Sequence, residues 1–448
     1  MHFSASTQFM PSAQRILRCS LVVSMLFGCV VTSSSQQISK ADRNLAQQML
    51  RDVAADVAKY YYDPKLHGVD WDAKVREARE NIDKADSMDS AVSEIAALLD
   101  TLNDSHTRLV LPPRNYVHRY GFGLKMIGDR CYVTRVHAGS DAEKKGLQRG
   151  DQVLAVNDLP VTRKTFWKVE YIFQVLRPQP GLRLTLVDED GQRRQVDAMA
   201  KVEPSSVIKY SLHQGINQMI RDWTVENDLL EPQYYEKGDQ FLAIRIPAFS
   251  LSPVGVDRVI DKMRKHKGVV LDLRGNPGGF SRTLDRLVGG MFENGLKIFD
   301  HLARDSNEPI LVDGRHRDAF TGRLAVLVDS GSASASELFA RTIQLQKRGF
   351  VMGDRSAGMV MEAKPYRHEI SVGTDNFYGA EITVADLIMT DGKRLEHAGV
   401  EPDILILPTA QDLSSHRDPV MAKAAGLVGY KVTPEEAGSM FPEKELEK

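Results

Sequence analysis

A chain of 448 residues is too long for one ordinary hydrophobic core, so we expect two or three domains. Hydrophobic residues make up 42% of the chain and charged residues 26%, a balance that excludes a membrane-embedded or fully disordered protein. The formal net charge is -2, and no run of one sign is long enough to follow a phosphate backbone, so we expect no nucleic-acid partner.

Residues 1–36 have the composition of an export signal. Arg15 and Arg18 precede an uncharged run, residues 19–31, which is too short to span a bilayer but suits the hydrophobic region of a signal peptide. The Leu-Phe-Gly-Cys sequence that ends at Cys29 resembles a bacterial lipoprotein cleavage box, with Cys29 as the lipidated residue. We therefore expect an exported protein, either a periplasmic protein or a lipoprotein anchored to the membrane. Simple signal cleavage, giving a secreted protein, stays open.

Residues 37–116 are expected to form a helical N-terminal domain. Apolar residues recur at spacings of three and four between Leu45 and Tyr60, which is typical of a helix with one buried face. A second helical stretch runs from about Trp71 to Leu102.

Residues 117–202 alternate short apolar strands with turns, which predicts a compact β-rich domain. A short helix is expected from Ser140 to Lys145, ending at Gly146, because glycine commonly follows the last helical residue. A longer helix is expected over residues 164–176.

The third domain, residues 203–410, alternates buried strands with helices. Strands are expected over residues 241–246, 268–273 and 324–328, each followed by a helix, and this pattern predicts a sheet with helical cover. The charged segment 411–448 is expected to be a peripheral C-terminal tail.

The serine-rich segment from Asp329 to Glu337 lies between an expected strand and an expected helix. A hydroxyl at such a turn is exposed above the sheet edge, and the helix N-terminus favours a developing oxyanion. Ser334 and Glu337 also fit a capping box, which needs no catalysis. Taken alone, the segment leaves both interpretations open.

The segment Leu-Asp-Leu-Arg-Gly-Asn-Pro-Gly-Gly, residues 271–279, follows another buried strand. Gly278 and Gly279 permit positive φ angles and a close approach of the backbone to a ligand. Their amides could donate to an oxyanion, although an ordinary turn would have the same sequence.

These two segments, followed by Gly-Val-Glu-Pro-Asp at residues 399–403, resemble the C-terminal-processing and tricorn family of serine peptidases. They occur in the family's order between about residues 240 and 407. The resemblance implies a multidomain peptidase with an α/β core of the ClpP/crotonase-like kind.

Residues 118–201 resemble a PDZ domain. The resemblance implies that polypeptide substrates are held by a free C-terminus, which the domain binds by adding a strand to its sheet. Its carboxylate-binding loop would consist of Gly121, Phe122, Gly123 and Leu124.

The family resemblance places the nucleophile at Ser334, the middle serine of Ser-Ala-Ser-Ala-Ser. It places the oxyanion hole at the Ala335 amide together with an amide of Gly278 or Gly279, since the amide directly after a nucleophile lies close to the carbonyl under attack.

The residue that matches the family's catalytic base indicates to which of its two branches this chain is similar. The C-terminal-processing branch uses a lysine base, but this chain has Met359 at the matching position, and methionine cannot accept a proton. The tricorn branch uses a histidine preceded by a serine, with a supporting glutamate, and the matching residues are His106, Ser105 and Glu396. Histidine's ordinary pKa near 6.5 predicts an acid limb of kcat/KM between about pH 6 and 7.5.

Two alternatives stay open. The chain could be a non-catalytic PDZ or ligand-binding protein on the same fold, or a peptidase with a displaced serine-lysine dyad that uses Lys364. No cofactor is expected. No metal is expected either, because His67, His368 and His397 have no partner at ligand spacing.

Overall fold

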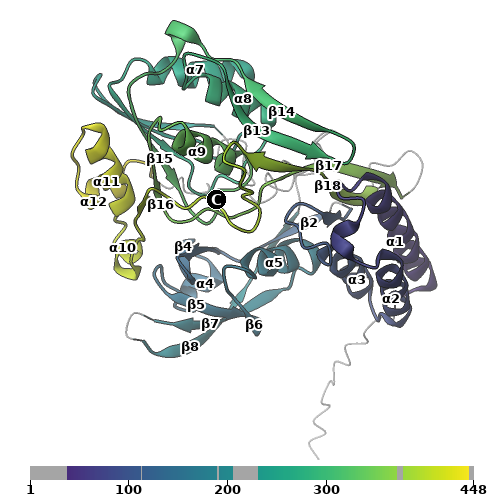
Figure 1. The fold of residues 1–448 in the computed structure, drawn as a ribbon. Coiled ribbons are helices and arrows are strands. Elements are labelled where there is room, and N and C mark those ends of the chain that lie inside the picture. The colour runs from purple at the N-terminus through teal and green to yellow at the C-terminus, as the bar shows by residue number, and fades with distance from the viewer. Residues whose placement is uncertain (1–37, 113, 189–190, 205–230, 371–376, 443–448) are drawn as a thin grey trace, which may run out of the picture. The chain divides into compact units, whose positions relative to one another are not determined.

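The computed structural model describes residues 38–112, 114–188, 191–204, 231–370 and 377–442 (Figure 1). The export signal expected over residues 1–36 lies outside these ranges and stays a prediction. Within the described ranges, no helix combines the length and the apolar character that crossing a membrane requires.

The expected helical N-terminal domain is confirmed. The buried face of α1 carries Met49, Val53 and Val57, whose spacing of four and four puts them on one side of a helix. The three α-helices of this domain each begin after a serine or aspartate whose side chain accepts a hydrogen bond from the amide three residues later. The elements are α1 (Lys40–Tyr60), η1 (Leu66–Gly68), α2 (Trp71–Lys84) and α3 (Met88–Asp100).

The β-rich domain folds around an antiparallel sheet with the strand order β3-β4-β5-β7-β8, and β6 pairs with β5. Val133 and Leu184 are fully buried in its core. Ser140 caps α4, and Gly146 follows that helix with a φ of +77°, as its sequence predicts. Among the described strands β3 pairs with β4 alone, so β3 is an edge strand of this sheet. The elements are β2 (Tyr116–Arg119), β3 (Phe122–Ile127), β4 (Arg130–Val136), α4 (Asp141–Lys144), β5 (Gln152–Val156), β6 (Leu159–Pro160), α5 (Phe166–Tyr171), η2 (Ile172–Leu176), β7 (Gly181–Val187), β8 (Arg193–Met199) and β9 (Lys201–Pro204).

The third domain contains a mostly parallel sheet with the order β10-β11-β12-β15-β16-β19, in which β10 alone among the described strands runs antiparallel to its neighbour. Successive side chains of a strand point to opposite faces, so Leu271 enters one core and Val270 another. Figure 1 shows α7, α8 and α9 on one side of this sheet and α11 on the other. The elements are β10 (Gln233–Lys237), β11 (Phe241–Arg245), α7 (Pro253–Met263), β12 (Gly268–Asp272), α8 (Ser281–Gly289), η5 (His316–Asp318), β15 (Arg323–Val328), α9 (Ala335–Leu345), β16 (Phe350–Gly353) and β19 (Ile404–Leu405).

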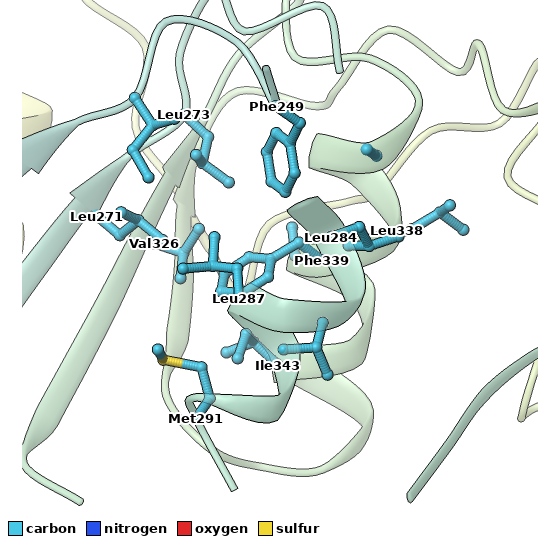
Figure 2. Close-up of a cluster of buried hydrophobic side chains, with 14 of the residues drawn as sticks. Phe249, Leu271, Leu273, Leu284, Leu287, Met291, Val326, Leu338, Phe339 and Ile343 are labelled. Carbon is cyan, nitrogen blue, oxygen red and sulfur yellow. The ribbon is translucent and has the colours of Figure 1, made fainter. Parts of the chain in front are cut away.

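Figure 2 shows the core beneath α8 and α9. Leu284 and Leu287 of α8 and Phe339 of α9 pack against Leu271 and Val326 of the sheet. Each of these side chains is at most 1% exposed, and burying one contributes roughly 1.5–3 kcal/mol. The core therefore holds the ends of β12 and β15, from which the glycine-rich and serine-rich segments emerge.

A second sheet, which the sequence did not lead us to expect, joins the helical domain to the third domain. Its order is β1-β18-β13-β14, and β17 also pairs with β18. Helix α1 lies against this sheet, with the Tyr60 ring stacked on Tyr366 at 4.2 Å and Asp56 bonded to His368 at 2.7 Å. The strands are β1 (Arg108–Val110), β13 (Leu296–Ala303), β14 (Asn307–Val312), β17 (Met361–Glu369) and β18 (Phe377–Met389).

The C-terminal segment is not the peripheral tail that we expected. Its helices are α10 (Ala410–Ser414), α11 (Pro419–Val428) and α12 (Pro434–Gly438). Val420 and Met421 are buried under the parallel sheet, because the small apolar residues of α11 cover its second face. Asp418 accepts hydrogen bonds from Arg274 at 2.7 and 3.0 Å, and Arg274 also donates to the fully buried Asp272. Since Arg274 precedes the Gly-Asn-Pro-Gly-Gly loop, the C-terminal helices help to hold that loop.

Candidate active site

Ser334 lies at a sharp turn between β15 and α9. Its backbone has φ 54° and ψ -118°, a conformation that costs free energy for a residue with a side chain. The Ser334 amide donates to the Met359 carbonyl at 2.8 Å and to Glu337 Oε2 at 3.0 Å, and these bonds hold the turn. Such a strained turn at the end of a strand is how α/β-hydrolases present a nucleophile.

Glu337 is fully buried beneath this turn and accepts four hydrogen bonds. Its donors are the amides of Ser334, Gly358 and Met359, at 3.0, 2.8 and 3.0 Å, and the Ser356 hydroxyl at 2.6 Å. Burial raises its pKa to about 7, and the four donors oppose that shift. The Glu337 half of the expected capping box is therefore present, and it holds the turn that presents Ser334.

Residues 356–360, here called the strap, follow β16 and cross between two halves of the site. On one side the Met359 carbonyl accepts a hydrogen bond from the Ser334 amide, and the Met359 amide donates to Glu337. On the other side the Val360 amide donates to Glu396 Oε2 at 2.7 Å. Met359, which the family resemblance matches to the lysine position, thus makes its hydrogen bonds through its backbone.

The second half of the site is the Asp-Ser-His-Thr segment that leads into β1. The Ser105 hydroxyl lies 2.8 Å from His106 Nδ1 and donates to Glu396 Oε2 at 2.9 Å. The Ser105 amide donates to Glu396 Oε1 at 2.8 Å. Both Ser105 and His106 are buried, at 6% and 4% exposure. The structure therefore joins His106, Ser105 and Glu396 into one hydrogen-bonded relay.

The relay determines which ring nitrogen of His106 carries the proton. The Ser105 hydroxyl has a single hydrogen, and it donates this to Glu396, so Ser105 must accept its bond from Nδ1–H. Nε2 then keeps a free lone pair and is able to accept a proton. Burial, and next the positive charge of Arg108, lower the pKa of His106 to about 4. The imidazole is therefore neutral at neutral pH.

No hydrogen bond joins His106 to Ser334 in the described part of the chain. The strap connects them instead, since Met359 accepts from Ser334 while the next residue, Val360, donates to Glu396. Burial raises the pKa of Glu396, and the amides of Val360 and Ser105 oppose that shift.

The amides that could face an oxyanion are not equally free. The Gly278 amide donates to Asn276 Oδ1 at 2.9 Å. The amides of Gly279 and Ala335 have no acceptor among the described residues. Gly278 packs so closely that a Cβ there would lie 2.8 Å from Ser334 Cβ and 2.9 Å from the Ala335 nitrogen. Two free amides thus flank the Ser334 turn.

Two families of known domains match parts of this chain. Residues 240–406 match the sequence model of Peptidase family S41, and residues 109–187 match that of the PDZ domain. The third domain is therefore a peptidase domain of family S41. The N-terminal helices, PDZ domain and α/β core are in the order that we expected.

Curated relatives of the chain are named as C-terminal-processing peptidases. The chain is 24% identical to carboxyl-terminal-processing peptidase 3, chloroplastic, of Arabidopsis thaliana, over 78% of this chain and 66% of the relative. It is 24% identical to the carboxy-terminal processing protease CtpA of Bacillus subtilis, over 59% of this chain and 51% of the relative. The chain therefore spans only about half to two thirds of these relatives. The structure of mature CPAF complexed with lactacystin has a similar fold, with a TM-score of 0.61 and 15% identity over 84% of this chain and 96% of that one.

The carboxylate-binding loop expected in the PDZ domain opens strand β3. Gly121 has a φ of +75°, and a Cβ there would lie 2.4 Å from Ser140 Cβ, so glycine is required at this position. Phe122, Gly123 and Leu124 continue into the half-buried start of β3. This part of β3 is an open sheet edge of the PDZ domain, of the kind to which a peptide strand can add.

Further along, β3 contacts the two loops that flank the nucleophile. Lys125 Nζ lies 2.6 Å from Asp329 Oδ2, and the Ser330 hydroxyl donates to the Met126 carbonyl at 2.6 Å. The Gly128 amide donates to Asp354 at 2.9 Å. The PDZ edge strand is therefore bonded both to the serine-rich segment and to the residues before the strap.

Two histidines outside the relay, His67 and His397, are bonded to protein groups. His67 lies 2.8 Å from both Tyr62 and the Leu102 carbonyl, and His397 lies 2.8 Å from the Asn103 carbonyl. Across the described ranges, no group of three or more His, Cys, Asp and Glu side chains could hold a metal ion.

Asn276 is a site residue to which the sequence analysis gave no role. It is fully buried, and its carbonyl accepts from the Ala333 amide and the Ser336 hydroxyl, each at 3.0 Å. Its side-chain amide donates to the Ile246 carbonyl at 2.7 Å while its Oδ1 holds Gly278. Asn276 thus fastens the glycine loop to the serine turn. Its position in Gly-Asn-Pro-Gly-Gly was the available signal.

Gly278→Ala is expected to lower kcat about a hundredfold, because the added methyl group would press on Ser334 and on the Ala335 amide. Steady-state kinetics on an unfolded protein substrate, with thermal melting as a folding check, measures the effect. Gly392→Ala is the matched control: Gly392 has a φ of +77°, but a Cβ there meets no atom within 4 Å. An equal loss in both variants would contradict steric blocking of the turn.

Proposed function

We propose that this protein is a serine endopeptidase that cleaves unfolded or C-terminally exposed polypeptides, with Ser334 as nucleophile and His106 as general base. Ser105 and Glu396 orient the imidazole and stabilise its protonated form. The observation that carries the proposal is the relay from His106 Nδ1 through Ser105 to Glu396, bonded by the strap to the Ser334 turn.

In the proposed reaction Ser334 Oγ forms a bond to the substrate carbonyl carbon while His106 Nε2 takes the hydroxyl proton. The carbonyl oxygen becomes an oxyanion, which the free amides of Ala335 and Gly279 stabilise. The carbon-nitrogen bond then breaks, and Nε2 returns the proton to the leaving amine. Water, activated by the same nitrogen, hydrolyses the acyl-enzyme and releases Ser334.

The position of Lys364 argues against the serine-lysine alternative. Lys364 lies in β17 and its side chain is exposed to solvent. A lysine base must be deprotonated, which requires burial to lower its pKa far below 10.4. An exposed strand residue does not meet that requirement.

For the substrate, we propose that the PDZ domain binds a free C-terminal carboxylate at the amides of residues 121–124. The Met126 carbonyl already accepts a bond from Ser330, so the open edge of β3 has room only for the last few residues of a bound chain. The upstream part of such a chain would continue toward the serine-rich segment.

A peptide substrate with an amidated C-terminus should have a KM about tenfold higher than the same peptide with a free carboxylate, since it lacks the charge that the loop binds. Paired kinetics on the two peptides measures the difference. A PDZ variant, Gly121→Ala, should abolish the preference, because its Cβ would clash with Ser140. Equal KM values for both peptides in the wild type would contradict carboxylate binding at this loop.

We further propose that the protein is exported, on the composition of residues 1–36 and the lipoprotein-like cleavage sequence that ends at Cys29.

A fluorophosphonate probe tests the proposed nucleophile directly. The probe should modify the wild-type protein, and peptide mass mapping should place the adduct on Ser334. An adduct on another serine, or labelling that persists in Ser334→Ala, would overturn the assignment.

A further inference from the structure

A second carboxylate lies beside the proposed base. Asp104 is 7% exposed and comes directly before the relay residue Ser105. Its Oδ1 accepts hydrogen bonds from the amides of His106 and Thr107, at 2.8 and 2.6 Å, and from the Thr383 hydroxyl at 2.9 Å. These bonds fasten the backbone that carries the imidazole to strand β18.

The second oxygen of this carboxylate faces a phenol and no cation. Asp104 Oδ2 and the hydroxyl of Tyr61 are both buried, and neither has another hydrogen-bond partner among the described residues. Burial, then the negative charge of Asp104 and hydrogen bonding to it, raise the pKa of Tyr61, so the phenol lies against this carboxylate. No cation forms an ion pair with Asp104 in the described part of the chain. A buried charge without a counter-charge is costly unless something else uses it.

We infer that Asp104 is a positioning residue for His106, and that its unpaired negative charge stabilises the imidazolium that forms when the base takes a proton. This inference rests on the proposed function. In the resting site His106 is neutral and the carboxylate lacks a counter-charge. In the transition state the ring becomes positive, and a fixed charge already in place costs no reorganisation. Asp104 would therefore favour the transition state over the ground state.

Glu396, Arg108 and Asp104 are charged groups that act on His106. Glu396 acts on the ring through Ser105, from the loop before residue 399. Arg108 of β1 opposes the imidazolium, but its guanidinium is bonded to Glu381 of β18 at 3.0 Å. The strap, residues 356–360, contains no charged side chain. Asp104 is thus a negative group near His106 that forms no ion pair among the described residues and is not part of the relay.

Asp104→Asn tests the charge, because asparagine keeps an oxygen for the three donors and its amide can donate to Tyr61. Removing the negative charge disfavours the imidazolium, so the pKa of His106 should fall further. We expect kcat to fall about tenfold with little change in KM. We also expect the activity ratio between pH 4 and pH 7 to rise, because the acid limb moves to lower pH.

Thr383→Val is the matched control, since it removes one bond to Asp104 but no charge. It should lower the melting temperature and leave the acid limb in place. If Thr383→Val moves the limb as far as Asp104→Asn does, position and not charge controls His106, and the inference fails. It also fails if Asp104→Asn keeps the wild-type rate and limb although His106→Ala abolishes activity.

Histidine resonances in the inactive Ser334→Ala background separate this inference from the proposed function. The His106 signal, identified by its absence after His106→Ala, should titrate near pH 4 while Asp104 is present. After Asp104→Asn in the same background, the ring should stay neutral to the acid limit of the fold. Such a change without any effect on kinetics would support the charge effect but refute His106 as the base. An unchanged titration would overturn the role of Asp104 itself.

Discussion

Ser334→Ala is expected to lower kcat by at least about four orders of magnitude, because it removes the oxygen that forms the covalent bond to the substrate. Activity that remains would come from the free amides of the turn and from substrate binding, which do not need the hydroxyl. Hydrolysis of an unfolded protein, followed by the appearance of new N-termini, measures the loss. Activity within tenfold of the wild type would refute the assignment of the nucleophile.

The fold of this variant should survive, and this makes the result interpretable. The amide of residue 334 is held by Glu337 and by the Met359 carbonyl, and neither bond involves the serine hydroxyl. Serine already occupies the positive φ angle, so alanine adds no new backbone strain. Loss of the hydroxyl should change the free energy of unfolding by no more than about 1 kcal/mol. Thermal melting checks this. Glu337→Ala, by contrast, should destabilise the turn.

The local pattern of the sequence predicted the central part of the fold well. Apolar runs that alternate with helical segments predicted strands over residues 241–246, 268–273 and 324–328. Strands β11, β12 and β15 lie within one residue of these bounds. Such buried strands have sequences that differ clearly from their surroundings. The second sheet was missed because its strands, such as β18, pair across long distances in sequence that no local pattern reports.

The candidate site shows the same division between local and distant information. The turn of Ser334 could be predicted because strand, serine and helix are consecutive. The contact between Ser105 and Glu396 joins residues 291 positions apart, and only the family resemblance suggested it. The roles of Glu337 and Asp104 depend on buried carboxylates that accept several hydrogen bonds at once, and a sequence does not show burial.

The structure also changes the expected pH dependence. The ordinary pKa of histidine predicted an acid limb of kcat/KM between about pH 6 and 7.5. Burial lowers the pKa of His106 to about 4, because a charged imidazole loses its hydration inside the protein. His106 must be neutral to accept a proton, so activity should be present above its pKa and lost as the pH falls through it. The acid limb should therefore lie near pH 4.

His106→Ala is expected to lower kcat at least about a thousandfold at neutral pH, since it removes the group proposed to accept the Ser334 proton. Glu396→Gln should cost less, because the glutamate orients and stabilises without taking the proton. Lys364→Ala and Met359→Leu should stay within about tenfold of the wild type: Lys364 is exposed, and Met359 contributes backbone bonds that leucine keeps. Kinetics of the four variants on one substrate decides between the two bases. Loss of activity in Lys364→Ala together with an active His106→Ala would exclude the relay. It would identify a displaced serine-lysine dyad, because the lysine and not the histidine would then be required for activity.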